Sequence, residues 1–145
     1  MRVYLDTSIY NRPFDDQTQP RIWLETLAFV VILQMVEAGE VELVSSSVLE
    51  YENSRNPFAL RKRWVDRCFS LVGYYQEVDE GIRERAQELG KEGLKAIDAM
   101  HVACAEAAGS ECFLTCDDRV IRRYQGRIKV FNPVDFVLSR TGGQL

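Results

Sequence analysis

Histidine and closely spaced cysteines are scarce in this sequence. The 145 residues include one histidine, His101, and four cysteines, of which only Cys112 and Cys116 lie near each other. A structural zinc site needs close pairs of such ligands, so this scarcity argues against zinc binding. We expect the cysteines to be buried free thiols instead.

Long hydrophobic runs are also missing. The longest uninterrupted apolar run, Leu27–Leu33, falls well short of the roughly 18 residues that a membrane-spanning helix needs. The N-terminal residues resemble a strand rather than a secretory leader, which predicts that there is no signal peptide. We therefore expect a cytoplasmic protein that does not bind membranes.

Linkers, internal repeats and low-complexity tracts are absent as well. A chain of 145 residues can form one domain with a substantial core. We predict a single domain over residues 1–139, followed by a flexible C-terminal tail at residues 140–145.

The chain lacks the net positive charge that is typical of nucleic-acid-binding proteins, because its formal net charge is −4. The basic residues nevertheless fall into two groups along the sequence. These groups are Arg55, Arg61, Lys62, Arg63 and Arg67, and Arg119, Arg122, Arg123, Arg127 and Lys129. Considered alone, two solvated helix faces are the simpler explanation of both groups.

Short apolar segments alternate with helical patterns along the whole chain. This alternation predicts a three-layer α/β/α fold with a mainly parallel sheet. The predicted strands are Arg2–Leu5, Val41–Val44, Tyr74–Val78, Cys112–Thr115 and Ile128–Phe131. The predicted helices are a largely buried one at Arg21–Ala38, one from Ser45–Ser47 to Arg55, and others at Phe58–Val72, Asp79–Leu89, Leu94–Ala108, Asp117–Tyr124 and from Pro133 onward. The polar stretch Asn11–Pro20 is predicted to be a loop.

Several of the apolar segments end in a carboxylate. Asp6 directly follows the first predicted strand, and Asp117 lies just past the fourth. In a parallel sheet, both positions fall beyond the carboxyl ends of the strands, where open α/β sheets bind their ligands. An acid at the edge of a core is costly unless something offsets its charge.

Two further acids lie on predicted helices. Glu52 lies four residues after Val48 and three after Leu49, which places it on their inward helix face. Glu50 lies away from Val48 and remains the rival for the same role. Asp98 is near the start of an apolar helix, from which it can lean toward the same crevice.

Taken singly, each acid has an ordinary structural explanation. Asp6 can start a turn and Asp117 can cap a helix. Asp98 can pair with Lys95 or Arg119, and Glu52 can pair with Arg55. Taken together, Asp6, Glu52, Asp98 and Asp117 favour a cluster that binds a divalent cation, since gathered carboxylates repel one another until a cation relieves the repulsion. Oxygen-rich sites suit Mg²⁺ or Mn²⁺, and those ions suit phosphate chemistry.

Three hydroxyl-bearing residues, Thr7, Ser8 and Thr115, lie beside these acids in the sequence. They can orient the carboxylates or hold water molecules around a metal ion. The commoner role for such residues is to satisfy backbone groups at strand ends, and the sequence leaves both roles open.

Three segments of the sequence resemble motifs of a known family. The segment Val3–Ser8 resembles the opening of a PIN domain, Ala96–Ala103 resembles its third acidic motif, and Phe113–Asp118 resembles its fourth. The resemblance covers nearly the whole chain. Asp6, Asp98 and Asp117 match the motif positions directly.

The resemblance implies a ribonuclease that depends on Mg²⁺ or Mn²⁺, with about five parallel strands and often a homodimeric assembly. Many small members are VapC-type toxins, each inhibited by an antitoxin partner whose segment occludes the acidic crevice. The second acid is Glu52 or its rival Glu50, and Asp118 is a candidate for an additional ligand. The stretch Asn11–Gln17 departs from the ordinary toxin pattern and indicates a subgroup.

On this interpretation the substrate is RNA, whose phosphates attract basic side chains. The residues expected to contact phosphates are Arg55, Arg61 and Arg119. The aromatic residues considered for stacking on a base are Tyr10, Phe14 and Tyr51.

Two other classes of function were weighed. The first is a nucleic-acid- or protein-binding module that has the nuclease fold without useful turnover. The second is an aspartate-based phosphotransfer protein, which is disfavoured because the phosphatase type needs a second aspartate two residues after the first, and that position holds Ser8.

Overall fold

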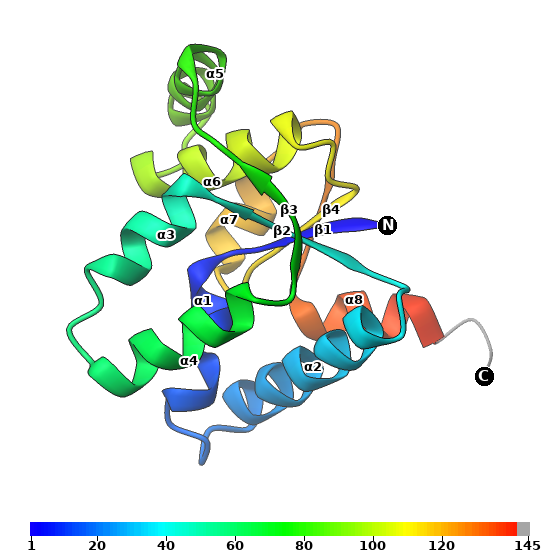
Figure 1. The fold of residues 1–145 in the computed structure, drawn as a ribbon. Helices are drawn as coiled ribbons and strands as arrows, with labels where there is room; N and C mark the ends of the chain where they lie inside the picture. The colour runs from blue at the N-terminus through cyan, green and yellow to red at the C-terminus, as the bar shows by residue number, and fades with distance from the viewer. Residues whose placement is uncertain (142–145) are drawn as a thin grey trace.

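A five-stranded, wholly parallel sheet forms the centre of the fold (Figure 1). The computed structural model describes residues 1–141. The strand order is β3-β2-β1-β4-β5, and the strands are β1 (Arg2–Leu5), β2 (Glu42–Ser46), β3 (Val72–Gln76), β4 (Cys112–Leu114) and β5 (Lys129–Phe131). The predicted three-layer α/β/α fold with a mainly parallel five-stranded sheet is thus confirmed.

Helices cover both faces of the sheet. Figure 1 shows α5 and α6 above the sheet and α2, α4 and α8 below it. The helices are α1 (Thr7–Asn11), the short 3₁₀ helix η1 (Arg12–Phe14), α2 (Pro20–Glu37), α3 (Ser47–Ser54), α4 (Ala59–Phe69), α5 (Glu80–Lys91), α6 (Ala96–Ala107), α7 (Asp118–Arg123) and α8 (Pro133–Thr141).

Strand β1 lies in the middle of the sheet and is covered on both faces. Val3, Tyr4 and Leu5 are fully buried, as expected for a parallel strand that reads as a continuous apolar run. Val3 pairs with Leu43 of β2 on one side and with Cys112 of β4 on the other. The chain therefore delivers the residue after β1 to the middle of the sheet edge.

Polar side chains cap the helices that start at this edge. Asp6 caps α1, Ser46 caps α3 and Asp117 caps α7, each by accepting a hydrogen bond from a backbone N–H in the first turn. Asp79 caps α5 in the same way, as the sequence predicted.

Two predicted boundaries were wrong in this part of the chain. The predicted loop Asn11–Pro20 holds the end of α1 and the 3₁₀ helix η1, because the Asp6 cap starts a helix that buries Ile9 and Tyr10. The helix predicted to reach Val72 ends at Phe69, and Val72 instead begins β3 by pairing with Leu43.

Helix α2 is less buried than its composition predicted. Its inner face buries Ala28, Phe29 and Ile32. Its outer face exposes four large apolar side chains, each with at least two fifths of its surface in solvent: Trp23, Leu24, Leu27 and Val30. The sheet and α8 cover only part of a helix that is apolar all round, so an apolar stripe stays exposed.

The C-terminal helix α8 continues to Thr141, so the predicted tail does not start at residue 140. Residues 142–145 lie outside the described part of the chain. Within residues 1–141, no helix is long and apolar enough to cross a membrane. The four cysteines are buried and free, as expected.

Glu25 on α2 is fully buried in a cluster of polar side chains below the sheet. Its carboxylate accepts hydrogen bonds from Arg12 (2.8 Å), Arg21 (3.1 Å) and Asn132 (2.5 Å). Burial alone would raise the pKa of Glu25, but these bonds and the charge of Arg12 lower it below its ordinary value of 4.5. The cluster ties η1 and α2 to the start of α8.

Because its folded-state pKa is lowered, Glu25 contributes stability that is present above pH 4.5 and is lost as the pH falls through the folded value. We expect Glu25→Gln to lower the free energy of unfolding by about 3 kcal/mol at neutral pH, since the arginines then lack their buried partner. The gap from the parent protein should shrink below pH 4.5. Urea unfolding at several pH values measures this difference in the free energy of unfolding. The control is Glu37→Gln, which changes an exposed glutamate on the same helix. A gap that does not change with pH would contradict this account.

Candidate functional site

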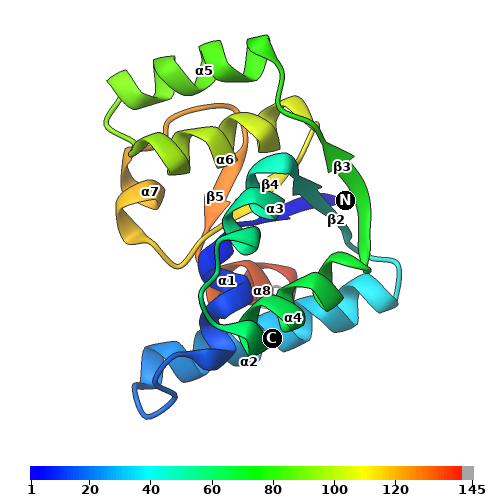
Figure 2. The ribbon, with the colours of Figure 1, turned by 60° about the vertical axis from the view of Figure 1, so that its left-hand side comes forward.

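The carboxyl edge of the sheet is surrounded by the helices that follow the strands. Figure 2 turns this edge toward the viewer and shows α1, α3 and α7 around it. Asp6 lies at the end of β1, Glu52 lies on α3, Asp98 lies in the first turn of α6, and Asp117 precedes α7. The four predicted acids therefore come from four separate elements that meet at one edge.

Asp6 is buried and held in place by its neighbours. Its backbone N–H donates to the carbonyl of Leu114 (3.1 Å), and its Oδ1 accepts from the N–H of Ser8 (3.0 Å) and from the Ser8 hydroxyl. Burial raises the pKa of Asp6, while hydrogen bonds from Ser8 and Thr115 oppose the rise. Repulsion from Asp98 adds to the rise, so the two acids are close enough to interact.

Glu52 is anchored through a single oxygen. Its Oε1 receives the Thr7 hydroxyl and lies 2.5 Å from Nε2 of His101. Within residues 1–141, Oε2 of Glu52 forms no hydrogen bond. Burial alone would raise the pKa of Glu52, but the hydrogen bond and charge of His101, together with Thr7, lower it.

Glu50, the rival acid, is exposed and accepts a hydrogen bond from the Tyr75 hydroxyl (3.0 Å) on strand β3. Of the two glutamates, Glu52 is the one that contacts Thr7, next to Asp6. This arrangement follows from the helix period, because Glu52 shares the face of buried Val48 and Leu49.

Asp98 is half-buried and, in the described part of the chain, its carboxylate forms no hydrogen bond and no ion pair within 4 Å. Burial raises the pKa of Asp98, and repulsion from Asp117 and Glu52 raises it further. His101 and Lys95 oppose the rise. An acid in this position favours the approach of a cation.

Asp117 caps α7 and pairs with Arg119. Its Oδ1 accepts from the Arg119 N–H (2.9 Å), and its Oδ2 lies 3.3 Å from a guanidinium nitrogen of the same residue. Burial would raise the pKa of Asp117, but the hydrogen bonds of Arg119 lower it. Lys95, Asp98 and Arg119 line the same small hollow in the surface.

The four carboxylates form an electrostatically coupled group rather than a finished metal site. Among residues 1–141, no three His, Cys, Asp or Glu side chains stand ready to hold a metal ion. The donors nevertheless fit Mg²⁺ or Mn²⁺, because Glu52 has an unused oxygen and Asp98 is without a hydrogen-bonding partner among those residues.

The residues predicted to support the acids contact them directly. Thr7 bonds Glu52 and Ser8 bonds Asp6. Thr115 accepts a hydrogen bond from the backbone N–H of Asp117 (3.0 Å). Its side chain also opposes the rise in the pKa of Asp6.

Other predicted site residues lie elsewhere. Asp118 points to Arg21, with two 2.8 Å contacts, rather than to the acids, because the first turn of α7 places successive side chains on different faces. Arg61 donates to the Phe14 carbonyl (3.1 Å) and lies over the Phe58 ring. Arg55 is exposed and lies over the Tyr51 ring (5.7 Å).

The three aromatic candidates differ in access to solvent. Tyr10 is fully buried and cannot stack on a base, since it packs against Phe29 and Phe69. Phe14 is half-buried, whereas Tyr51 is exposed.

His101 is the residue that sequence reasoning missed. It was counted only against a zinc site, although it lies three residues after Asp98 and thus on a neighbouring helix face. The structure places it in direct contact with Glu52. The available signal was a lone histidine inside an apolar, alanine-rich helix.

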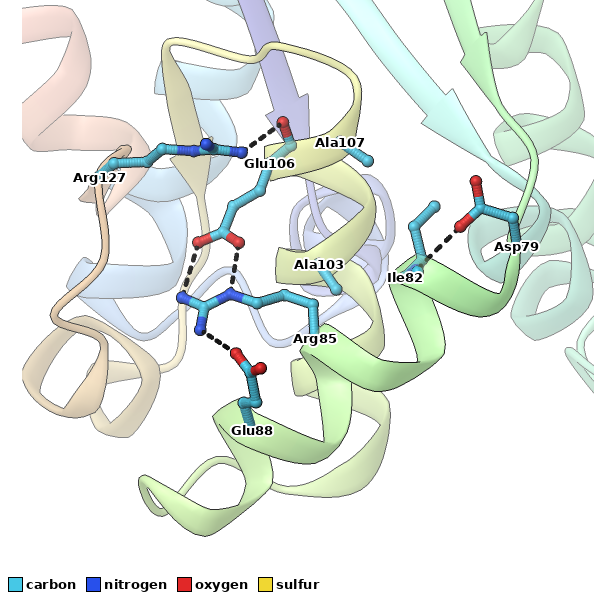
Figure 3. A pocket seen from close by; sticks show the side chains of 9 residues that line it. Asp79, Ile82, Arg85, Glu88, Ala103, Glu106, Ala107 and Arg127 are labelled. Atoms are coloured by element: carbon cyan, nitrogen blue, oxygen red, sulfur yellow. Dashed lines mark hydrogen bonds and ion pairs between the residues drawn. The ribbon is translucent and has the colours of Figure 1, made fainter.

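A cavity lies away from the acids, between α5 and α6 (Figure 3). It measures about 600 Å³. Across it, Arg85 pairs with buried Glu106 (2.7 Å), which also accepts from the Tyr124 hydroxyl (2.5 Å). The charge of Glu106 is balanced by Arg85, and this ion pair joins α5 to α6.

Comparison with known proteins relates the chain to one family. A family model described as PIN domain matches residues 3–126. No curated protein matches the chain.

Several solved structures share the fold at low sequence identity. FitAcB from Neisseria gonorrhoeae has 19% identity and a TM-score of 0.59, with 90% of this chain and 97% of that chain covered. VapBC2 from Rickettsia felis, solved bound to a DNA fragment from their promoter, has 14% identity and a TM-score of 0.60, with 91% of this chain and 98% of that chain covered. PAE2754 from Pyrobaculum aerophilum has 19% identity and a TM-score of 0.58, with 99% of this chain and 91% of that chain covered.

Proposed function

The chain belongs to the PIN domain family, and on that premise we propose that it is a metal-dependent endoribonuclease that hydrolyses RNA phosphodiester bonds. The observation that carries this proposal is the placement of Asp6, Glu52, Asp98 and Asp117 on elements that meet at the carboxyl edge of the sheet.

Asp6, Glu52, Asp98 and Asp117 would hold the cation through carboxylate oxygens. When bound there, Mg²⁺ or Mn²⁺ supplies a Lewis acid for the phosphate and lowers the pKa of a water molecule. Ser8 and Thr7 keep the Asp6 and Glu52 carboxylates from rotating, so that their free oxygens stay available.

Basic side chains beside the acids would bind the RNA backbone. Arg119 and Lys95 line the hollow that Asp98 reaches, and both are exposed. A phosphate that draws Arg119 to itself also releases Asp117 for the cation. Arg55 and Arg61 would contact phosphates farther along the strand, and Tyr51 would offer a ring for stacking.

The experiment is cleavage of a labelled single-stranded RNA with Mg²⁺, with Mn²⁺ and with a chelator. We expect internal cleavage only when the metal is present. Metal-independent cleavage, or RNA binding without cleavage under both metals, would contradict the proposal, and the second result would favour a binding module without turnover.

The choice between Glu52 and Glu50 gives a matched pair of variants. We expect Glu52→Gln to lower kcat/KM for RNA roughly tenfold to 100-fold, because the site loses a charged ligand anchored by two hydrogen bonds. Glu50→Gln should cleave like the parent, since Glu50 is exposed and, among residues 1–141, its carboxylate is hydrogen-bonded to Tyr75 alone. The reverse order of the two rates would assign the role to Glu50.

The partners are also proposals. Two similar solved structures are of FitAcB and of VapBC2 with DNA from their promoter, and this likeness supports an antitoxin partner that covers the acidic crevice. We further propose a homodimer, because α2 exposes an uncharged stripe whose residues repeat at helical spacing and can face their own copy across a two-fold axis. The molar mass in solution tests the dimer.

A further inference from the structure

His101 lies in a buried row of polar groups that links three elements to the acidic site. Its Nε2 is 2.5 Å from Oε1 of Glu52, and its Nδ1 is 2.7 Å from the Tyr4 hydroxyl. The Tyr4 hydroxyl lies 2.6 Å from Oγ of Ser46. His101, Tyr4 and Ser46 are all buried.

Each hydrogen bond in this row has a definite donor and acceptor. A glutamate carboxylate only accepts hydrogen bonds, and Oε1 of Glu52 already receives the Thr7 hydroxyl, so Nε2 of His101 donates to the same oxygen. Burial holds the pKa of Tyr4 well above its ordinary value, so the phenol keeps its proton and can donate to Nδ1. Ser46 then donates to the Tyr4 oxygen.

The row also returns to the helix that carries Glu52. Ser46 accepts from the backbone N–H of Leu49 (3.2 Å) and is the N-cap of α3. The same helix is therefore fixed at its start by Ser46 and at Glu52 by His101. Tyr4 is itself held by stacking on Phe113, with ring centroids 5.4 Å apart.

We propose that His101 is a positioning residue of the acidic site, which holds Oε1 of Glu52 so that Oε2 remains available to a divalent cation. The proposal rests on the proposed function for its consequence, but the donor role of Nε2 stands on the geometry alone. His101 does not touch the substrate on this account and acts only through Glu52.

The first test reads the proton positions directly. His101 is the single histidine, so a long-range ¹⁵N–¹H spectrum of the metal-free protein gives one unambiguous imidazole pattern. We expect Nε2 to carry a proton. A bare Nε2 with the proton on Nδ1 would overturn the proposal, whether or not the protein cleaves RNA.

The second test measures Mn²⁺ affinity by calorimetry in a pair of variants. His101→Gln keeps an N–H donor at the distance of Nε2, whereas the shorter His101→Asn does not. We expect His101→Asn to weaken Mn²⁺ binding about tenfold or more, and His101→Gln to restore most of the loss. Equal affinity in the parent and His101→Asn would overturn the proposal.

A control separates positioning from general stability. Glu106→Gln on the same helix breaks the buried contact with Arg85, far from the acids, and should lower the melting temperature without changing Mn²⁺ affinity. If the parent protein itself binds no Mn²⁺, the proposed function fails, while the ¹⁵N spectrum still decides the role of His101.

Discussion

We expect Asp98→Asn to lower the rate of RNA cleavage on the order of 1,000-fold, the largest effect of any substitution considered for this chain. Metal ions contribute several kcal/mol to such reactions, and each 1.4 kcal/mol changes a rate tenfold. The Asp98 carboxylate forms no hydrogen bond in the described chain, so replacing it with asparagine breaks no hydrogen bond of the fold. Single-turnover cleavage of a labelled RNA measures the effect.

The same substitution should not weaken the metal-free protein. The pKa of Asp98 is raised by burial and by Asp117, so its folded state binds a proton more tightly than its unfolded state. Its carboxylate therefore costs the metal-free protein stability as the pH rises through the folded value. We expect the melting temperature of metal-free Asp98→Asn to equal or exceed that of the parent.

Asp135 offers a matched control, because it is also an aspartate in the first turn of a helix but is exposed on α8. Asp135→Asn should cleave like the parent. If Asp98→Asn retains cleavage, or loses it only together with its fold, the role given to Asp98 is wrong.

The second large effect is stabilisation by metal. We expect Mn²⁺ at about 100 times its dissociation constant to raise the free energy of unfolding by about 2.7 kcal/mol, since the ion binds only the folded acids. For a domain of this length, that gain corresponds to a rise in melting temperature of roughly 8 °C. Differential scanning calorimetry with increasing Mn²⁺ measures the rise.

Two controls make this result specific. Na⁺ or K⁺ at equal ionic strength separates site binding from general screening of charge. Asp98→Asn should lose most of the rise, and Asp135→Asn should keep it. A rise of the same size in both variants would place the bound ion away from the acids.

Much of the fold could be predicted because local signals agree with the global arrangement. The buried strands are short apolar runs, and Ser46 and Asp79 are N-cap residues at the places where helices begin. Glu52 was preferred to Glu50 from the helix period alone, and the structure places it beside Thr7. The edge on which Asp6 and Asp117 fall follows from the parallel sheet.

Other features depend on contacts that no local pattern contains. The cap formed by Asp6 starts α1, a helix that the sequence did not predict, and this helix buries Tyr10. The stripe of α2 is exposed because no other element among residues 1–141 covers it. The contact between His101 and Glu52 joins residues 49 positions apart, which one sequence without an alignment cannot reveal.

The most direct test of the shared acidic site is anomalous diffraction from crystals of the protein soaked in Mn²⁺. This account predicts a peak within about 2.3 Å of carboxylate oxygens of Asp6 and Asp98, with Glu52 and Asp117 close by. A peak confined to Asp118 or Glu50, or none at all at saturating Mn²⁺, would contradict it.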